Sequence, residues 1–482
     1  MATSRREFLK GTAWMGAAAL VSGCTGGRLC SCGRGAPMWD FAVPPLRKVR
    51  VGCVGLGERG EMATHRLSQI PGLEIAALCD IRPEAVAKAV AWLKKSGKPV
   101  PREFVGAEAW RAMCDWDGID VAYIMTPWAL HAPMALGAMR AGKHALVEVP
   151  AAMTLDECYE MIETCEATRR HCMMLENSCY GDLNMFTLNL CRSGVLGELK
   201  HGECSYIHDL RSFNWNVPNW DGHWSKHGYY DYWRLKWNAA HRGNMYPTHG
   251  IGPMCQFMNI NRGDKFDYLV SMECKPMGLE RYAQDKFPEG SWQRKMKIAS
   301  GDMNTTLIKT HLGRTIMLQH DVSSPRPHIG FLLLSGTKGT ITGDPRRLGV
   351  EKEPGSGVKE FSDKEYEEYR EKYRHPLWKK AGEIAKKVGG HGGTDFICDL
   401  RWAYCLQNGL PLDMNVYDLA TWCSICELTE RSVNGRSKTM DVPDFTRGKW
   451  KTAKPLGIVD VDIDKMGLDA DRVQGGVSAA HS

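Results

Sequence analysis

The chain has 482 residues, of which 43% are apolar and 24% charged, and its formal net charge is +6. This length accommodates two or three domains, and the composition is typical of a soluble globular protein. Arg5, Arg6 and Lys10 against Glu7 contribute +2 of the charge, so the remaining excess is too small for the dense basic surface of a nucleic-acid-binding protein.

The first 23 residues are predicted to be an export signal. Arg5 and Arg6 lie in a stretch that resembles a twin-arginine motif. The apolar run that follows, 13–21, is too short to span a bilayer. An amphipathic N-terminal helix is the alternative interpretation. The twin-arginine route carries folded proteins, so a bound cofactor could be exported in place.

A lipid anchor is predicted directly after this signal. The run ends in Val-Ser-Gly-Cys, which resembles a lipobox with Cys24 as the lipidated residue. We therefore expect a periplasmic or cell-envelope lipoprotein that contacts the membrane through this anchor alone. Residues 24–45 are rich in glycine at their start and would form a linker. Most of the eighteen cysteines are predicted to be small buried side chains, with partial disulfide pairing left open.

Residues 46–178 are predicted to form a dinucleotide-binding Rossmann domain. An apolar strand over 47–54 leads into Gly55-x-Gly57-x-x-Gly60, in which the glycines permit a tight turn, approach of the backbone to a pyrophosphate and close helix packing. A second strand ends at Asp80, 20 residues after Gly60, where a carboxylate would bind the adenosine ribose hydroxyls. The cofactor is therefore predicted to be NAD, although Arg82 weakens the discrimination against NADP.

Further strands extend this parallel sheet. Strands are expected over 120–125, 143–148 and 171–175, followed in turn by Trp128, Glu148 and Asn177. The carboxyl ends of strands in a doubly wound sheet face the cofactor crevice. These strand ends fall where a nicotinamide ring would lie. The fold class is therefore α/β, beginning with a Rossmann doubly wound parallel sheet.

Residues 179–455 are predicted to form a second, α+β domain with a largely antiparallel open sheet, followed by an irregular tail, 456–482. Strand-like stretches recur over 268–273, 305–311, 315–319, 330–335 and 339–341. Between Tyr206 and Tyr246, aromatic side chains alternate with His, Asn, Asp and Arg. Such a mixture suits either a sugar-binding surface or an oligomer interface.

At this point the chain resembles the glucose-fructose oxidoreductase and inositol dehydrogenase superfamily, whose usual Glu-Lys-Pro is replaced here by Glu148-Val149-Pro150. Its motifs are similar to those of glycoside hydrolase family 109, from about Val49 to about Lys451. These motifs are Glu148-Val149, Glu176-Asn177-x-Cys-Tyr180, Tyr206-x-His208-Asp209-Leu210-Arg211, Tyr246-Pro247-Thr248-His249-Gly250 and Gly390-His391-Gly392-Gly393-x-Asp395.

The resemblance implies an NAD-dependent α-N-acetylgalactosaminidase that acts on a glycan or glycoside. Such enzymes are a recognised exception to the two-carboxylate mechanism. The implied reaction is redox-neutral: oxidation at sugar C3, elimination across C2 and C1, addition of water and reduction. A self-recycling NAD(P)-dependent sugar oxidoreductase and a non-catalytic sugar-binding lipoprotein remain alternatives. Association into a homo-oligomer is also expected from the superfamily.

The resemblance also assigns site residues. His249 is the predicted acid/base at the C3 hydroxyl and Tyr180 the predicted C2 base, which would need a lowered pKa; Tyr246 and Glu148 complete the catalytic set. The predicted cofactor contacts are Gly55, Gly57, Glu58, Arg59, Gly60, Asp80, Trp128, His131, Glu148, Val149, Asn177 and Tyr246. The predicted substrate contacts are Tyr206, Arg234, Tyr246, Pro247, Thr248, His249 and His328, the last at a position where a tyrosine is expected. His391 either is catalytic or anchors a loop, and no metal site is predicted.

Overall fold

The computed structural model describes residues 35–217, 228–328, 330–353 and 355–475. The predicted signal, Cys24 and the start of the linker lie outside these residues, as does the end of the tail. The described residues belong to one compact unit. None of their helices is long and apolar enough to cross a membrane.

A six-stranded parallel sheet forms the N-terminal half, in the order β3-β2-β1-β4-β5-β6. Its strands are β1 (Val49–Val54), β2 (Leu73–Asp80), β3 (Arg102–Val105), β4 (Val121–Ile124), β5 (His144–Val147) and β6 (Cys172–Met174). The central strands β4 and β5 are buried at every position, as expected for a sheet covered on both faces. This strand order is that of a Rossmann fold, which confirms the predicted doubly wound sheet.

Helices connect these strands. They are α2 (Glu58–Leu67), α3 (Pro83–Lys95), α4 (Ala109–Asp115), α5 (Trp128–Arg140) and α6 (Leu155–Thr168). Proline stands at the start of α3, and Thr154 with Glu157 forms a capping box at α6. These local signals fix where helices begin, and the carboxyl ends of β1, β4 and β5 are left facing one crevice.

The second sheet has nine strands in the order β14-β13-β12-β11-β7-β10-β9-β8-β15. Its strands are β7 (Leu199–Ile207), β8 (Phe266–Glu273), β9 (Asn304–Thr310), β10 (Thr315–Asp321), β11 (Leu332–Gly336), β12 (Gly339–Gly343), β13 (Arg346–Glu351), β14 (Val358–Glu360) and β15 (Met440–Asp441). All neighbours are antiparallel except β7 and β10, which are parallel. The predicted open, largely antiparallel sheet is therefore confirmed, and β7 is a central strand that the sequence analysis did not identify.

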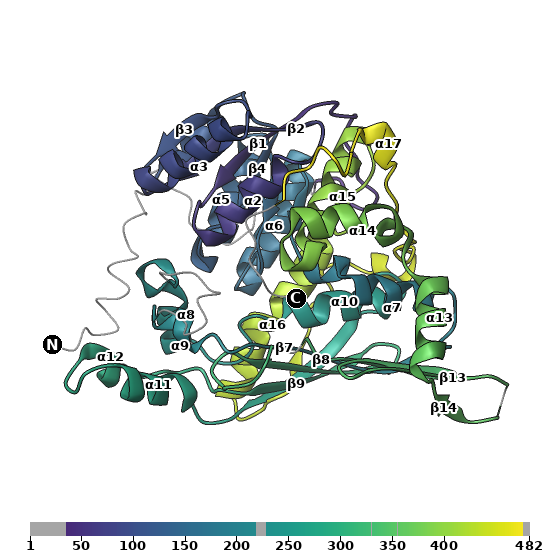
Figure 1. Ribbon diagram of the computed structural model, residues 1–482. Helices are drawn as coiled ribbons and strands as arrows, with labels where there is room; N and C mark the ends of the chain where they lie inside the picture. Colours follow the sequence, from purple (N-terminus) through teal and green to yellow (C-terminus); the bar gives the residue numbers. More distant parts are fainter. Residues whose placement is uncertain (1–34, 218–227, 329, 354, 476–482) are drawn as a thin grey trace, which may run out of the picture. The chain divides into compact units, whose positions relative to one another are not determined.

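Helices cover one face of this sheet and join it to the first domain. Figure 1 shows α7 (Asp182–Arg192), α10 (Thr248–Phe257) and α16 (Val416–Asn434) between the large sheet and the Rossmann half. Helix α10 packs on β7 and α16 on β8, whereas α15 (Thr394–Asn408) contacts α2 and β1. The start of α15 thereby lies against the glycine-rich turn.

The remaining elements are short or peripheral. They are η1 (Asn177–Tyr180), α8 (Arg211–Asn214), η2 (Tyr230–Tyr232), α9 (Trp233–Ala240), α11 (Gly278–Lys286), α12 (Trp292–Lys295), α13 (Asp363–Tyr373), α14 (Pro376–Val388), η3 (His391–Gly393), η4 (Lys449–Lys451) and α17 (Ile463–Met466). Helix α13 matches the charged helix that its sequence predicts, and its Ser362 and Glu365 form a capping box.

The described cysteines are free thiols. All of them are buried except Cys191, which is partly buried, and the exposed Cys274. Cys423 and Cys426 have Cys-x-x-Cys spacing, but both lie inside α16 and remain unpaired. The prediction that most cysteines are small buried side chains is confirmed for this part of the chain.

Candidate functional site

The glycine-rich turn after β1 has the shape that a dinucleotide needs. Gly55 has φ +86°, and a Cβ at Gly60 would lie 1.9 Å from the carbonyl oxygen of Gly55. A Cβ at Gly57 would meet only the Arg82 side chain, at 3.9 Å, so this side of the turn is open. Helix α2 begins at Glu58 and offers the free N–H groups of its first turn to a phosphate. The turn therefore fits the pyrophosphate of NAD.

Asp80 stands where the ribose contact is predicted. Its Oδ2 accepts a 2.6 Å hydrogen bond from the Leu56 N–H, which ties the end of β2 to the glycine turn. Its Oδ1 accepts from the backbone N–H and Nε of Arg82, at 2.9 and 3.1 Å. The carboxylate is thus held at the crevice, with Arg82 as its neutralising partner.

A network of charges joins the cofactor side of the two domains. Arg59 donates to Glu148 at 2.6 Å and to Asp395 at 2.5 Å. Asn177 donates to the other oxygen of Asp395 at 2.5 Å. Burial would raise the pKa of Asp395, yet the charges of Arg59, His391 and Arg66 hold it well below its ordinary value. The buried carboxylate of Asp395 therefore brings the predicted cofactor contacts Arg59 and Asn177 together, and Arg59 adds Glu148.

One atom of this network is left for a ligand. The Oδ1 of Asn177 is buried and accepts no hydrogen bond from the described residues. A buried carbonyl oxygen without a donor is costly, so its presence at the strand ends is evidence for a bound N–H group. The amide of a nicotinamide supplies such a donor, and the residues present here fit NAD.

His249 is paired with a buried carboxylate. Its Nδ1 lies 2.6 Å from Oε1 of Glu176, whose side chain is fully buried and also accepts from the Ser178 N–H at 3.0 Å. Glu176 lies two residues after the end of β6, and His249 lies in the first turn of α10. A carboxylate at Nδ1 fixes the tautomer and leaves Nε2 for proton transfer. The arrangement suits an acid/base histidine.

His391 forms a second pair of this kind. Its Nδ1 lies 3.0 Å from Oδ2 of Asp395, and its side chain is 58% exposed. It lies in a loop in which Gly389, Gly390, Gly392 and Gly393 all have positive φ. The loop thus presents an accessible imidazole that is held by a buried carboxylate, an arrangement compatible with both a catalytic and a loop-anchoring role for His391.

Aromatic rings form the wall of the predicted sugar site. Tyr246 stacks on Trp128 with ring centroids 5.6 Å apart, and Tyr206 contacts both Tyr246 and His249, at 4.8 and 5.3 Å. The guanidinium of Arg234 lies 4.8 Å from the Trp128 ring and 4.7 Å from the Tyr246 ring. Trp128 comes from the Rossmann half and the other residues from the second. The predicted cofactor and substrate contacts therefore adjoin each other.

The role of C2 base predicted for Tyr180 stays a prediction, and two features of its surroundings oppose it. Its hydroxyl donates to Asp413 at 3.0 Å, and Asp413 is also bound by Arg401. Burial raises the pKa of Tyr180 well above its ordinary value, whereas a base would need a lowered one. Burial likewise raises the pKa of Tyr246, which therefore contributes its ring and a hydrogen-bond donor to the site.

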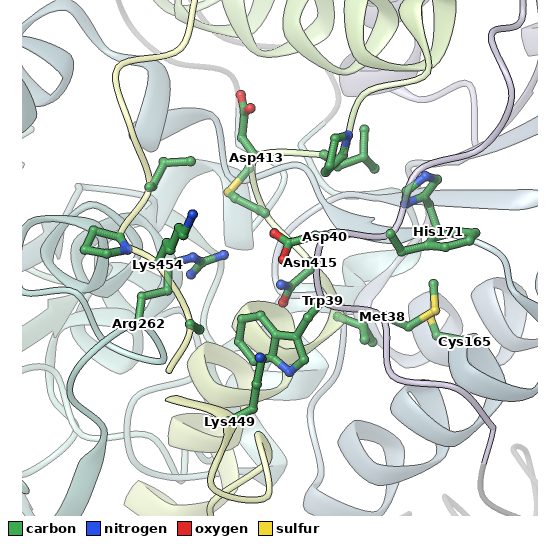
Figure 2. A pocket seen from close by; sticks show the side chains of 18 of the residues that line it. Met38, Trp39, Asp40, Cys165, His171, Arg262, Asp413, Asn415, Lys449 and Lys454 are labelled. Carbon is green, nitrogen blue, oxygen red and sulfur yellow. The ribbon is translucent and has the colours of Figure 1, made fainter. Parts of the chain in front are cut away.

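Asp413 lies on the wall of a separate cavity of about 470 Å³, shown in Figure 2. Trp39, Asp40, Arg262, Lys449 and Lys454 are among the residues that line it. None of its lining residues is a predicted site residue. The Tyr180 hydroxyl is thus directed to Asp413, on the wall of this cavity, and not to the pair of His249 and Glu176.

His131 is buried, and its predicted cofactor contact stays a prediction. Its side chain is 1% exposed, and its ring nitrogens lie 2.8 Å from the carbonyl oxygen of Pro150 and 2.6 Å from that of Thr126. The ring thus lies between the segments that follow β4 and β5 and links them through one of these two carbonyls. The side chain of Val149 is 4% exposed and its carbonyl accepts from the Trp128 indole at 3.2 Å.

The substrate contact predicted for Thr248 stays a prediction. Its hydroxyl is buried and makes no hydrogen bond to a described residue.

The sequence analysis did not assign Glu176 or Asp395 a role. Both were within quoted motifs, and Glu176 stands at a strand end, which is a usable signal. No sequence signal marked Asp395, because its position beside Arg59 results from the packing of α15 on α2.

Pro247 precedes α10, and Glu58 is the exposed first residue of α2. Among the described residues, no group of three His, Cys, Asp or Glu side chains is placed to hold a metal ion.

Family models match both halves of the chain. Residues 49–176 match an oxidoreductase family with an NAD-binding Rossmann fold, and residues 180–452 match the C-terminal domain of glycosyl hydrolase 109. A glycosyl hydrolase family 109 protein from Shewanella pealeana is 43% identical over 467 residues, which cover 95% of this chain and 100% of the relative. One from Shewanella amazonensis is 44% identical over 460 residues, covering 95% and 99%.

Solved structures share the fold at low sequence identity. An NAD-binding oxidoreductase from Klebsiella pneumoniae superposes with a TM-score of 0.61 and 16% identity, covering 82% of this chain and 99% of the other. A levoglucosan dehydrogenase in complex with NADH and levoglucosan gives 0.60 and 19%, covering 82% and 100%. These likenesses establish the two-domain architecture. The family models and the curated relatives establish more: the chain belongs to glycosyl hydrolase family 109, as an enzyme built on an NAD-binding Rossmann domain.

Proposed function

We propose that the protein is a redox-neutral, NAD-dependent glycosidase that releases terminal, α-linked N-acetylgalactosamine. The observation that carries this proposal is the pair of histidine–carboxylate contacts, Glu176 with His249 and Asp395 with His391. A simple alcohol oxidation needs one proton-transfer group, whereas oxidation followed by elimination needs at least two. The same carboxylate, Asp395, also holds Arg59 and Asn177 on the cofactor side.

His249 serves the sugar C3 hydroxyl in this proposal. Bound NAD would supply hydride acceptance at C3 and hydride return at the end of the turnover. Glu176 holds the Nδ1 side of the imidazole, so that Nε2 removes the C3 hydroxyl proton and later restores it. Val149 is aliphatic and brings no ammonium group to this place, which leaves His249 as the local base.

His391 takes the second proton transfer, which the sequence analysis had assigned to Tyr180. The elimination step, in which the C2 proton leaves and the C1–O bond breaks, requires an accessible group with a pKa near neutrality. His391 is exposed and held by Asp395, whereas Tyr180 is buried with a raised pKa. Trp128, Tyr206 and Tyr246 supply ring faces for the sugar and exclude water.

The test is hydrolysis of 4-nitrophenyl α- and β-N-acetylgalactosaminides by the purified protein without added NAD. Release of nitrophenol with no net NADH supports the proposal. An oxidised sugar without release of nitrophenol would contradict it and would favour a self-recycling sugar oxidoreductase. Binding of the sugar with neither reaction would favour a non-catalytic lipoprotein.

We also propose that the enzyme is exported by the twin-arginine route and anchored through Cys24. The support is the sequence of the first 24 residues, together with a reaction that regenerates its own cofactor and needs no external NADH pool. An Arg5→Lys/Arg6→Lys variant should stay in the cytoplasm, and a Cys24→Ala variant should be released from the membrane fraction. Wild-type protein in the cytoplasmic fraction would contradict this localisation.

A further inference from the structure

A tyrosine of the second domain contacts the Rossmann half at the end of β2, where the adenosine part of NAD is expected. The guanidinium of Arg82 lies 5.0 Å from the ring centroid of Tyr230, which belongs to η2. The same guanidinium bonds Asp80, through Nε at 3.1 Å and Nη2 at 3.4 Å. Its Nη2 would lie 3.9 Å from a Cβ at Gly57 in the glycine-rich turn. Arg82 thus connects the predicted ribose and pyrophosphate contacts to a ring of the other domain.

The turn that carries Tyr230 has an unusual backbone. Asp231 and Tyr232 have φ values of +50° and +54°, a region that residues other than glycine rarely adopt. Such conformations persist only where the surroundings hold them, and they are concentrated at functional sites. Here Lys236 donates to Asp231 at 2.7 Å, and the Tyr232 ring packs edge-on against Trp292 at 5.3 Å. The second domain therefore holds the turn in the conformation that directs Tyr230 to the Rossmann half.

The two halves of the chain are joined at both ends of the predicted cofactor crevice, with different strength. Near the strand ends that would face the nicotinamide, Arg59 bonds Asp395 at 2.5 Å, and the Asp395 side chain is 1% exposed. At the adenosine end, the side chain of Arg82 is 27% exposed and Tyr230 is 53% exposed. A buried ion pair is costly to break, whereas an exposed cation–π contact is weak. The adenosine end is therefore the weaker closure, by which a bound dinucleotide would leave.

We infer that the contact between Arg82 and Tyr230 retains NAD, because it holds the second domain over the adenosine end of the crevice and must break before the cofactor leaves. This inference goes beyond the proposed glycosidase and depends only on the NAD-binding domain. Retention serves any reaction that oxidises and then reduces the same sugar, since loss of NADH between the two steps would leave an oxidised sugar behind. Tyr230 is thus a positioning residue that acts through Arg82.

The rate of NAD release tests this inference without any substrate. The holoenzyme is loaded with radiolabelled NAD and chased with excess unlabelled NAD, and the label that stays bound is followed by rapid gel filtration. Tyr230→Ala should release the label about fivefold faster than the wild type, the factor expected for loss of an exposed cation–π contact. Tyr230→Phe keeps the aromatic face and should restore slow release. A wild-type release rate in Tyr230→Ala would overturn the inference.

Tyr268→Ala is the matched control for the loss of an exposed tyrosine. Tyr268 is 40% exposed and lies on β8, in the second sheet. We expect this variant to release NAD at the wild-type rate, and far-UV circular dichroism checks that every variant is folded. If Tyr268→Ala accelerated release as much as Tyr230→Ala, the effect would not belong to the contact with Arg82, and the inference would fail.

A double-mutant cycle tests whether Tyr230 acts through Arg82. Arg82→Gln should also speed the release of NAD, and adding Tyr230→Ala to it should produce no further acceleration, because the contact is already lost. Additive acceleration would show that Tyr230 acts independently and would overturn the assigned contact. Since no glycoside is present, none of these results depends on whether the protein hydrolyses one.

Discussion

Two arginines in this site have opposite surroundings. Arg59, on the cofactor side, bonds Glu148 at 2.6 Å and Asp395 at 2.5 Å. Arg234, on the sugar side, is more deeply buried and has no carboxylate among the described residues. Carboxylates complete the first environment, whereas the described part of the second consists of aromatic faces and the Tyr229 hydroxyl. We therefore expect Arg59 to position the cofactor side of the site and Arg234 to contact the sugar.

The largest effect is expected at His249, which serves the sugar C3 hydroxyl in the proposed mechanism. His249→Ala should lower kcat/KM by about 10³-fold, since positioned acid/base groups contribute about 10²–10⁴-fold. Glu176→Gln should lower it by a smaller factor, because the histidine remains but its tautomer is no longer fixed. Steady-state kinetics on a nitrophenyl glycoside measures both. Full turnover in His249→Ala would remove that residue from the mechanism.

The next comparison is between His391 and Tyr180. His391→Ala should lower kcat by about 10²-fold, as expected for loss of a proton-transfer group. Tyr180→Phe removes the hydroxyl bonded to Asp413 and should leave kcat within about twofold, with a stability loss of about 1 kcal/mol. If the Tyr180 variant lost activity while His391→Ala kept it, the two roles would have to be exchanged.

Asp395 should matter most for stability. Asp395→Asn leaves Arg59 and Arg66 beside a neutral amide and should lower the free energy of unfolding by about 3 kcal/mol, since breaking a buried pair costs about 3–5 kcal/mol. Asp209→Asn is the control, because the Asp209–Arg211 pair is partly exposed and worth about 1 kcal/mol or less. Denaturant unfolding measures both, and equal losses would contradict the buried network.

The smallest effect is expected on the stability of the protein at acidic pH. Burial lowers the pKa of His144 to about 4 and that of His171 to about 3, both below the unfolded value of about 6.5. The unfolded chain therefore binds more protons between these values, so this stability is full above pH 6.5 and is lost as pH falls toward 4. The free energy of unfolding should depend less steeply on pH in His144→Asn, by up to about 1.4 kcal/mol per pH unit. His201→Asn, at a partly exposed position of β7, is the control for the loss of a histidine side chain as such.

The Rossmann half was readable from sequence because its signals are local. Apolar runs, Gly55-x-Gly57-x-x-Gly60 and Asp80 occur at fixed spacings, and the observed strands agree with them. Strand β7 was missed because alternating small and polar residues, such as Gly202 and Glu203, conceal a central strand. The hydrogen bond from Tyr180 to Asp413 could not be predicted, because a motif gives proximity in sequence and not the direction of a side chain. Asp395 needed the long-range packing of α15.

The measurement that tests the central claim most directly is turnover in D₂O. The account predicts that the holoenzyme, with no added cofactor, releases sugar that carries deuterium at C2, with no net NADH, because the C2 proton is removed and replaced in every cycle. His391→Ala should slow release of the aglycone and of this labelled sugar together. Released sugar without deuterium at C2 would contradict the elimination mechanism and, with it, the role given to the second histidine.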